Sequence, residues 1–194
     1  MNNNQIVLCN YPKDNEVTIE KYNEFIKNKD KKKLAEFVYN RLYSRYIRPF
    51  EYRDNDFKEQ YKNGFSMMAS YCLLIETLQS FKNGWGDTKE KSKEAFRQFF
   101  ENNDKFDSLN NRGEEFYYKI RCGILHQGET TGGWKIRRDG ELVENKTINA
   151  TKFGMKLEET LKEYREELKK SDWDSEILDN FRVKMRKIIK NCKE

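Results

Sequence analysis

The sequence predicts a mainly helical, all-α protein: a bundle of about five to six helices with one small β-hairpin inserted. Apolar residues recur at helical spacing along most of the chain. Charged residues make up 37% of it, as expected for helices with solvated outer faces. No internal repeat and no linker rich in Gly, Pro or Ser divides the 194 residues. We therefore expect a single domain over residues 1–194.

The N-terminal elements are expected to be a short apolar run and two helices. The run is Ile6–Cys9, and Thr18 is expected to cap the first helix. A second helix follows over about residues 34–46, and Pro49 is expected to end it or kink it at Arg48. The apolar positions of the two helices are Tyr22, Phe25, Ile26, Leu34, Phe37, Val38, Leu42 and Tyr46.

The strongest helical pattern covers about residues 60–81. This segment is apolar on so much of its circumference that we expect it at the centre of the fold. Gly84 and Gly86 then supply a stop and a turn. The two apolar rows are Phe65, Met68, Cys72 and Ile75, and Met67, Tyr71, Leu74 and Leu78.

Two helices are expected in the middle of the chain. Asp87 with Glu90 resembles a capping pair that opens the first of them. Asn111 is expected to start the second, which runs to a stop at Gly128. The apolar residues of the two helices are Ala95, Phe96, Phe99, Phe100, Phe116, Tyr117, Ile120, Ile124 and Leu125.

The pattern changes after this pair of helices. Two short strands that flank Asp139–Gly140 predict a β-hairpin at about residues 133–145. Asn149 is expected to cap a long helix, and Asp174 or Ser175 to open the last one. The apolar side of the long helix carries Phe153, Leu157, Leu161, Tyr164 and Leu168, and that of the last helix carries Ile177, Phe181, Ile188 and Cys192.

Composition narrows the class of function only a little. The formal charge of +5 is too small to identify a nucleic-acid binder unaided. The four cysteines are scattered and the chain has one His, so we expect neither a metal site nor a cofactor. The sequence opens without a basic, apolar leader, and no run approaches about 18 apolar residues. A cytoplasmic protein without membrane contact is the simplest expectation.

The segment from Phe116 to Glu129 carries the most informative pattern, because Arg121 and the lone His126 are separated by four residues near the end of an apolar helix. In this it resembles the HEPN superfamily of helical domains, whose nuclease members carry an Arg, four to six residues, and then a His. The resemblance implies a metal-independent endoribonuclease that acts on RNA as a homodimer, with two motifs in one cleft. It also implies phage defence or a toxin–antitoxin system, with an antitoxin or defence partner protein.

The chain departs from that family at two positions. Cys122 follows Arg121, where many active members carry Asn, Asp or His. Gly128 stands two positions after His126, where members paired with nucleotidyltransferase antitoxins carry Tyr. The first departure favours an alternative: a non-catalytic HEPN-like module that binds RNA, nucleotide or a protein partner. The second disfavours that particular antitoxin.

The chemistry of the pair suits RNA cleavage by the 2′-hydroxyl. Arg121 can hold the phosphate, and His126, in the last helical turn, is expected as an imidazolium that acts as general acid. Five residues at about 100° each separate the two by about 140° around a helix. We therefore expect Arg121 of one copy to meet His126 of the other in the dimer.

Several further residues are candidates for support. Glu76 interrupts the central apolar run and either orients Arg121 or, more simply, reaches water. Tyr117 and Tyr118 can stack on a base, although core or interface positions are the commoner outcome. Cys122 is not expected to act as a nucleophile, because the chain has no second His to activate its thiol. The cations that either contact RNA or form a solvated face are Arg41, Arg45, Arg48, Arg137 and Arg138.

Overall fold

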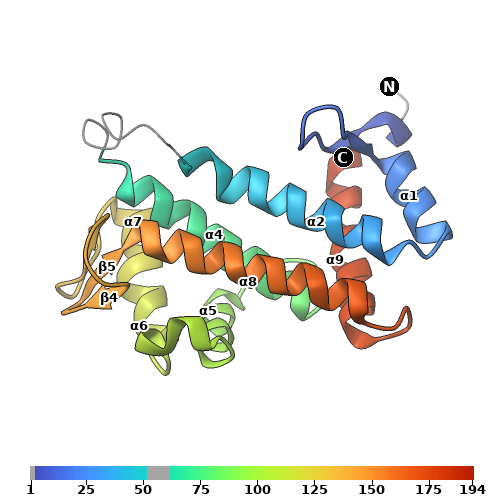
Figure 1. The fold of residues 1–194 in the computed structure, drawn as a ribbon. Helices are drawn as coiled ribbons and strands as arrows, with labels where there is room; N and C mark the ends of the chain where they lie inside the picture. Colours follow the sequence, from blue (N-terminus) through green and yellow to red (C-terminus); the bar gives the residue numbers. More distant parts are fainter. Residues whose placement is uncertain (1–2, 52–61) are drawn as a thin grey trace. The chain divides into compact units, whose positions relative to one another are not determined.

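The computed structural model describes residues 3–51 and 62–194, and it is mainly helical with small strand elements, as the sequence predicts (Figure 1). Eight α-helices lie within these residues, more than the five to six expected. The helices are α1 Ile19–Lys27, α2 Lys31–Tyr46, α4 Gly64–Lys82, α5 Ser92–Glu101, α6 Gly113–Phe116, α7 Cys122–Gln127, α8 Ala150–Lys170 and α9 Glu176–Lys193. None of them is long and apolar enough to cross a membrane.

The remaining elements are short. One π-helical turn, Tyr117–Arg121, joins α6 to α7. Three 3-10 helices cover Asn3–Gln5, Arg48–Phe50 and Asp104–Leu109. The strands are β1 Val7–Cys9, β2 Val17–Thr18, β3 Lys135–Arg137, β4 Val143–Glu144 and β5 Thr147–Asn149.

These elements divide into two compact units that alternate along the chain. The first unit runs up to Arg45 and also includes Ser80–Asp87 and Leu161–Glu194. The second comprises Tyr46–Gln79 and Thr88–Thr160. The single domain expected over residues 1–194 stays a prediction.

In the first unit, β1 and β2 pair antiparallel ahead of α1. The expected cap of α1 is confirmed, since the Thr18 hydroxyl accepts the Lys21 N–H at 3.3 Å. Aromatic rings fill the core of this unit: the Phe81 ring lies 5.8 Å from that of Phe181. The other buried rings of this unit are Tyr22, Phe25, Phe37, Tyr39 and Tyr164.

In the second unit, α4 is the central helix that its two apolar rows predict. Every member of those rows is buried except Phe65, which is half-buried. The start expected at residue 60 lies outside the described residues, and α4 begins at Gly64. Six phenylalanines pack together in the core: Phe96, Phe99, Phe100, Phe106, Phe116 and Phe153.

The hairpin predicted at residues 133–145 is wrong in its pairing. The sheet order is β3-β5-β4, with β3 parallel and β4 antiparallel to β5. The tight turn lies at Asn145 and Lys146, both with positive φ, and not at Asp139–Gly140. The central strand β5 carries the fully buried Ile148.

Side-chain caps confirm two of the predicted helix starts, at Thr18 and Asn149, and two other predicted starts are wrong. Asn149 caps α8, accepting the N–H groups of Thr151 and Lys152 at 3.0 and 3.1 Å. Asp87 with Glu90 does not open α5, which begins at Ser92 without a side-chain cap. Asn111 likewise does not cap α6, because it has a positive φ and α6 begins at Gly113.

The last helix begins after Ser175, one of the two expected positions. Its buried side is made by Leu178, Phe181 and Met185. Cys192, expected on that side, is exposed in the last turn of α9. Only Phe181 of the expected apolar row is therefore fully buried.

Candidate functional site

The helix that carries Arg121 contains a local irregularity that the sequence does not predict. At Tyr117–Arg121 the Cys122 N–H bonds to the Tyr117 carbonyl, five residues earlier, which is the π-helical pattern. Such turns are rare and occur frequently at functional sites. Arg121 is the last residue of this turn, immediately before α7.

The end of α7 shapes the surface beside the motif. Gly128 has φ +72°, and its N–H bonds to the Ile124 carbonyl at 3.2 Å, which confirms the predicted stop. The next N–H, of Glu129, bonds back to the Gly123 carbonyl at 3.3 Å. A Cβ at Gly123 would lie 2.4 Å from the Glu129 carbonyl oxygen, so this reversal requires glycine there. It leaves His126 exposed in the last helical turn.

Arg121 is held by a buried carboxylate. Its Nε donates to Glu76 Oε1 at 2.8 Å, and Glu76 is only 6% exposed. The hydroxyls of Thr88 and Ser92 each donate to Glu76 Oε2 at 3.1 Å. The orienting role of Glu76 is thus the one the geometry supports, and the simpler expectation that it reaches water is wrong.

This arrangement affects the protonation of the guanidinium in two opposing ways. Burial lowers the pKa of Arg121, but the hydrogen bonds and charge of Glu76 and the contact with Cys122 outweigh it and raise that pKa. Arg121 therefore stays cationic. Sequence reasoning missed Thr88 and Ser92, although a buried carboxylate at Glu76 demands donors of this kind.

His126 lies within reach of Arg121 of the same chain. Arg121 Nη1 is 3.3 Å from His126 Nε2. The expectation that the two residues need separate copies to meet is therefore wrong. Five helical residues rise roughly 7.5 Å, a distance that the long Arg side chain can span, so the angle between the two positions does not keep their end groups apart.

The contact also bears on which form of His126 is present. A guanidinium has only donors, so a hydrogen bond to Nε2 requires that nitrogen to accept. The imidazolium expected from the helix dipole stays a prediction. The geometry fits a general base in the free protein.

Aromatic rings and a thiol surround the pair. The Arg121 guanidinium carbon lies 5.6 Å from the Tyr117 ring centroid. Burial, followed by the hydrogen bond with Cys122, raises the pKa of Tyr117. Tyr118 is 50% exposed, so of the two tyrosines it has the ring more accessible to a base. Cys122 is half-buried and contacts Tyr117 and Arg121.

The cations proposed for RNA contact have different surroundings. Arg41 is buried and donates to the Leu8 carbonyl, so it is structural and its predicted phosphate role is wrong. Arg138 is half-buried and donates to Asn63 Oδ1 at 3.0 Å. Arg45, Arg48 and Arg137 are exposed and stay candidates.

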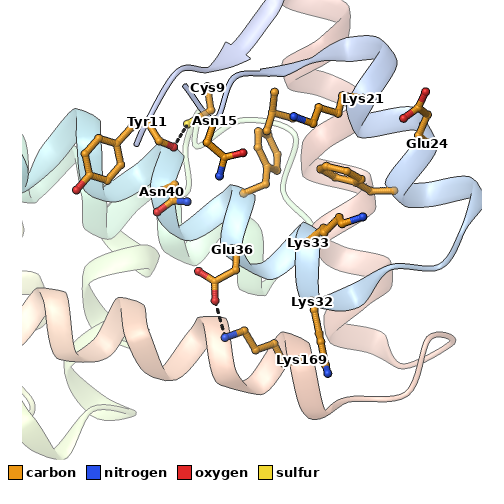
Figure 2. A pocket seen from close by; sticks show the side chains of 13 residues that line it. Cys9, Tyr11, Asn15, Lys21, Glu24, Lys32, Lys33, Glu36, Asn40 and Lys169 are labelled. Atoms are coloured by element: carbon orange, nitrogen blue, oxygen red, sulfur yellow. Dashed lines mark hydrogen bonds and ion pairs between the residues drawn. The ribbon is translucent and has the colours of Figure 1, made fainter. Parts of the chain in front are cut away.

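Other places in the described chain offer less chemistry. Residues 3–51 and 62–194 contain no group of three or more His, Cys, Asp or Glu side chains placed to hold a metal. The first unit has a cavity of about 700 Å³, shown in Figure 2. Its lining mixes four lysines with two glutamates, of which Glu36 pairs with Lys169 at 2.6 Å. The chain's one histidine belongs to the second unit, where the candidate site lies.

Comparisons with protein-family models, with curated proteins and with solved structures found no match to this chain. The case for function therefore depends on the site itself. The site consists of the Arg121 guanidinium, which Glu76 orients, the neighbouring exposed imidazole of His126 and the exposed ring of Tyr118.

Proposed function

We propose that this protein is a metal-independent endoribonuclease of HEPN type, with Arg121 and His126 as its catalytic residues. The observation that carries the proposal is the approach of Arg121 Nη1 to His126 Nε2 at 3.3 Å, at a helix end where His126 is exposed. A cation beside an accessible base is what phosphodiester cleavage requires. Phage defence or a toxin–antitoxin setting, with an antitoxin or defence partner protein, belongs to the same proposal.

The reaction follows from the roles that each group can take. Once Arg121 Nη1 binds the phosphate instead of His126 Nε2, that nitrogen accepts the proton of the 2′-hydroxyl, whose oxygen attacks phosphorus and displaces the 5′-oxygen. Arg121 binds the non-bridging oxygens and stabilises the charge of the phosphorane. Breaking the bond from phosphorus to the 5′-oxygen leaves a 2′,3′-cyclic phosphate, which water opens to a 3′-phosphate. Tyr118 can stack on a flanking base.

The leaving 5′-oxygen must gain a proton in the same step. One chain has one imidazole, and it is occupied as the base. A second copy would supply an imidazolium as the acid. We therefore keep the homodimer as part of the proposal, although Arg121 and His126 of one chain already meet. The expected active species is dimeric in sedimentation, and a fully active monomer would refute this part.

The test is RNA cleavage in EDTA by purified parent, Arg121→Ala and His126→Ala proteins. We expect both variants to lose at least about 100-fold in rate, as is usual for removal of an acid–base group. Imidazole in the buffer should partly restore the His126→Ala protein, which a merely structural role would not allow. Gln127→Ala, at the exposed neighbouring position, is the matched control and should cleave like the parent. Unchanged cleavage by both site variants would overturn the proposal.

The alternative function is a non-catalytic module that binds RNA, nucleotide or a protein partner. The half-buried Cys122 favours this alternative, because it places a thiol beside Arg121 at the position where many active HEPN members carry Asn, Asp or His. It predicts RNA binding without new RNA ends and no change in growth inhibition on His126→Ala. Expression of parent and variant in cells, followed by sequencing of RNA ends, separates the two functions and reveals the substrate class.

A further inference from the structure

A groove lined by residues of α1 and α9 in the first unit combines an apolar floor with a row of cations. Its volume is about 510 Å³. We call it the α1–α9 groove and define it by Ile26, Ile189, Arg186, Lys190 and Lys193. It does not include any residue of the proposed catalytic site.

The cations of the groove lie on one face of α9. Arg182, Arg186, Lys190 and Lys193 follow one another at spacings of four, four and three, which align side chains along a helix. None of the residues that line the groove is Asp or Glu. This spacing of cations is visible in the sequence itself.

Most of these cations are available to a partner. Arg186 and Lys193 are exposed, and among residues 3–51 and 62–194 neither forms an ion pair. Lys190 has only a distant pairing with Glu194, at 3.9 Å. Arg182 is different, because it binds Asp179 and the Trp173 carbonyl. Three cations over about 10.5 Å of helix therefore face the groove.

The floor of the groove is aliphatic and uncharged. Ile26 and Ile189 are half-buried, so part of each side chain meets solvent. Tyr22 lies beneath them and is 5% exposed, and its burial raises the pKa of the phenol even beside Arg182 and Arg186. The phenol thus stays neutral, and no anion in the floor offsets the row of cations.

We propose that the α1–α9 groove binds an acidic amphipathic helix of a partner protein. Aliphatic side chains of that helix would cover Ile26 and Ile189, and its carboxylates would pair with Arg186, Lys190 and Lys193. Single-stranded RNA fits less well, because sequence-tolerant RNA binding uses exposed aromatic rings and the only ring of this groove is buried. The proposal does not depend on the ribonuclease activity.

The test uses the full chain and a fluorescently labelled helical peptide of about four turns, with leucines along one face and glutamates on its flanks. A second peptide carries lysines in place of the glutamates. We expect saturable binding of the glutamate peptide in fluorescence anisotropy. Reversal of Arg186, Lys190 and Lys193 to Glu should weaken it about tenfold or more, the sum of three partly exposed ion pairs. The same reversal should create binding of the lysine peptide.

The control reverses three exposed cations of the second unit, Lys62, Lys135 and Arg137, and should leave peptide binding unchanged. Circular dichroism checks that both variants are folded. The proposal is overturned if the glutamate peptide does not bind saturably, or if both triple variants lose binding equally. It is also overturned if an oligouridylate or phosphatidylglycerol vesicles bind the groove more tightly than the peptide.

Discussion

Breaking the pair of Glu76 and Arg121 tests whether the carboxylate positions the guanidinium. The perturbation is a double-mutant cycle with Glu76→Gln, Arg121→Gln and the two combined. Gln is close to Glu in shape and keeps a carbonyl acceptor for Arg121 Nε, so the first change removes charge with little loss of volume. The hydroxyls of Thr88 and Ser92 can rotate to accept from the new amide.

The magnitude follows from burial and distance. The Nε to Oε1 distance is 2.8 Å, and the two side chains are 16% and 8% exposed. Solvent screening of the kind that weakens surface pairs is therefore small. Hydrogen bonds to charged groups contribute about 1.5–3 kcal/mol, and stranding one partner of a buried pair costs about 3–5 kcal/mol. Since Gln keeps one acceptor, we expect Glu76→Gln to cost about 2–3 kcal/mol.

The assay is urea unfolding of the four proteins at pH 7. The coupling free energy of the cycle should be about 1.5–3 kcal/mol, because the second substitution removes a charge that the first already left unpaired. Glu94→Gln is the control, since Glu94 pairs with Arg97 on the exposed face of α5 and its loss should hardly move the midpoint. A coupling below about 0.5 kcal/mol would refute the reasoning.

Two further predictions concern the surroundings of the site. Gly123→Ala places a Cβ 2.4 Å from the Glu129 carbonyl oxygen and should lower the free energy of unfolding in urea by about 2 kcal/mol. Gly86→Ala is the control and should be near neutral, because a Cβ there makes only ordinary contacts. Equal unfolding midpoints for the two variants would contradict this prediction. The hydrogen bond from Arg112, opposed by burial, lowers the pKa of Glu115. That carboxylate therefore contributes stability above its unfolded pKa of about 4.3, which is lost as the pH falls through the lower folded value. Glu115→Gln should flatten the loss of stability from about pH 5 downwards, and parallel pH profiles for the two proteins would show that the pair contributes nothing.

Local patterns in the sequence were enough to determine most of the helices. The cap at Thr18, the cap at Asn149 and the stop at Gly128 each involve groups at most four residues apart, so the sequence around them contains the whole interaction. The apolar rows of α4 identified the central helix for the same reason. Arg121 and His126 were identified as a candidate pair from their spacing near a helix end together with the family resemblance that this spacing suggests.

Tertiary structure decided how that pair is arranged. Glu76 lies 45 residues before Arg121, and the hydroxyls that hold it come from a third segment, so no local pattern reveals the network. The sheet order β3-β5-β4 and the burial of Arg41 also depend on residues far apart in sequence. Periodicity describes an isolated helix. Which charged groups leave water, and what they then bind, is determined only when distant segments pack together.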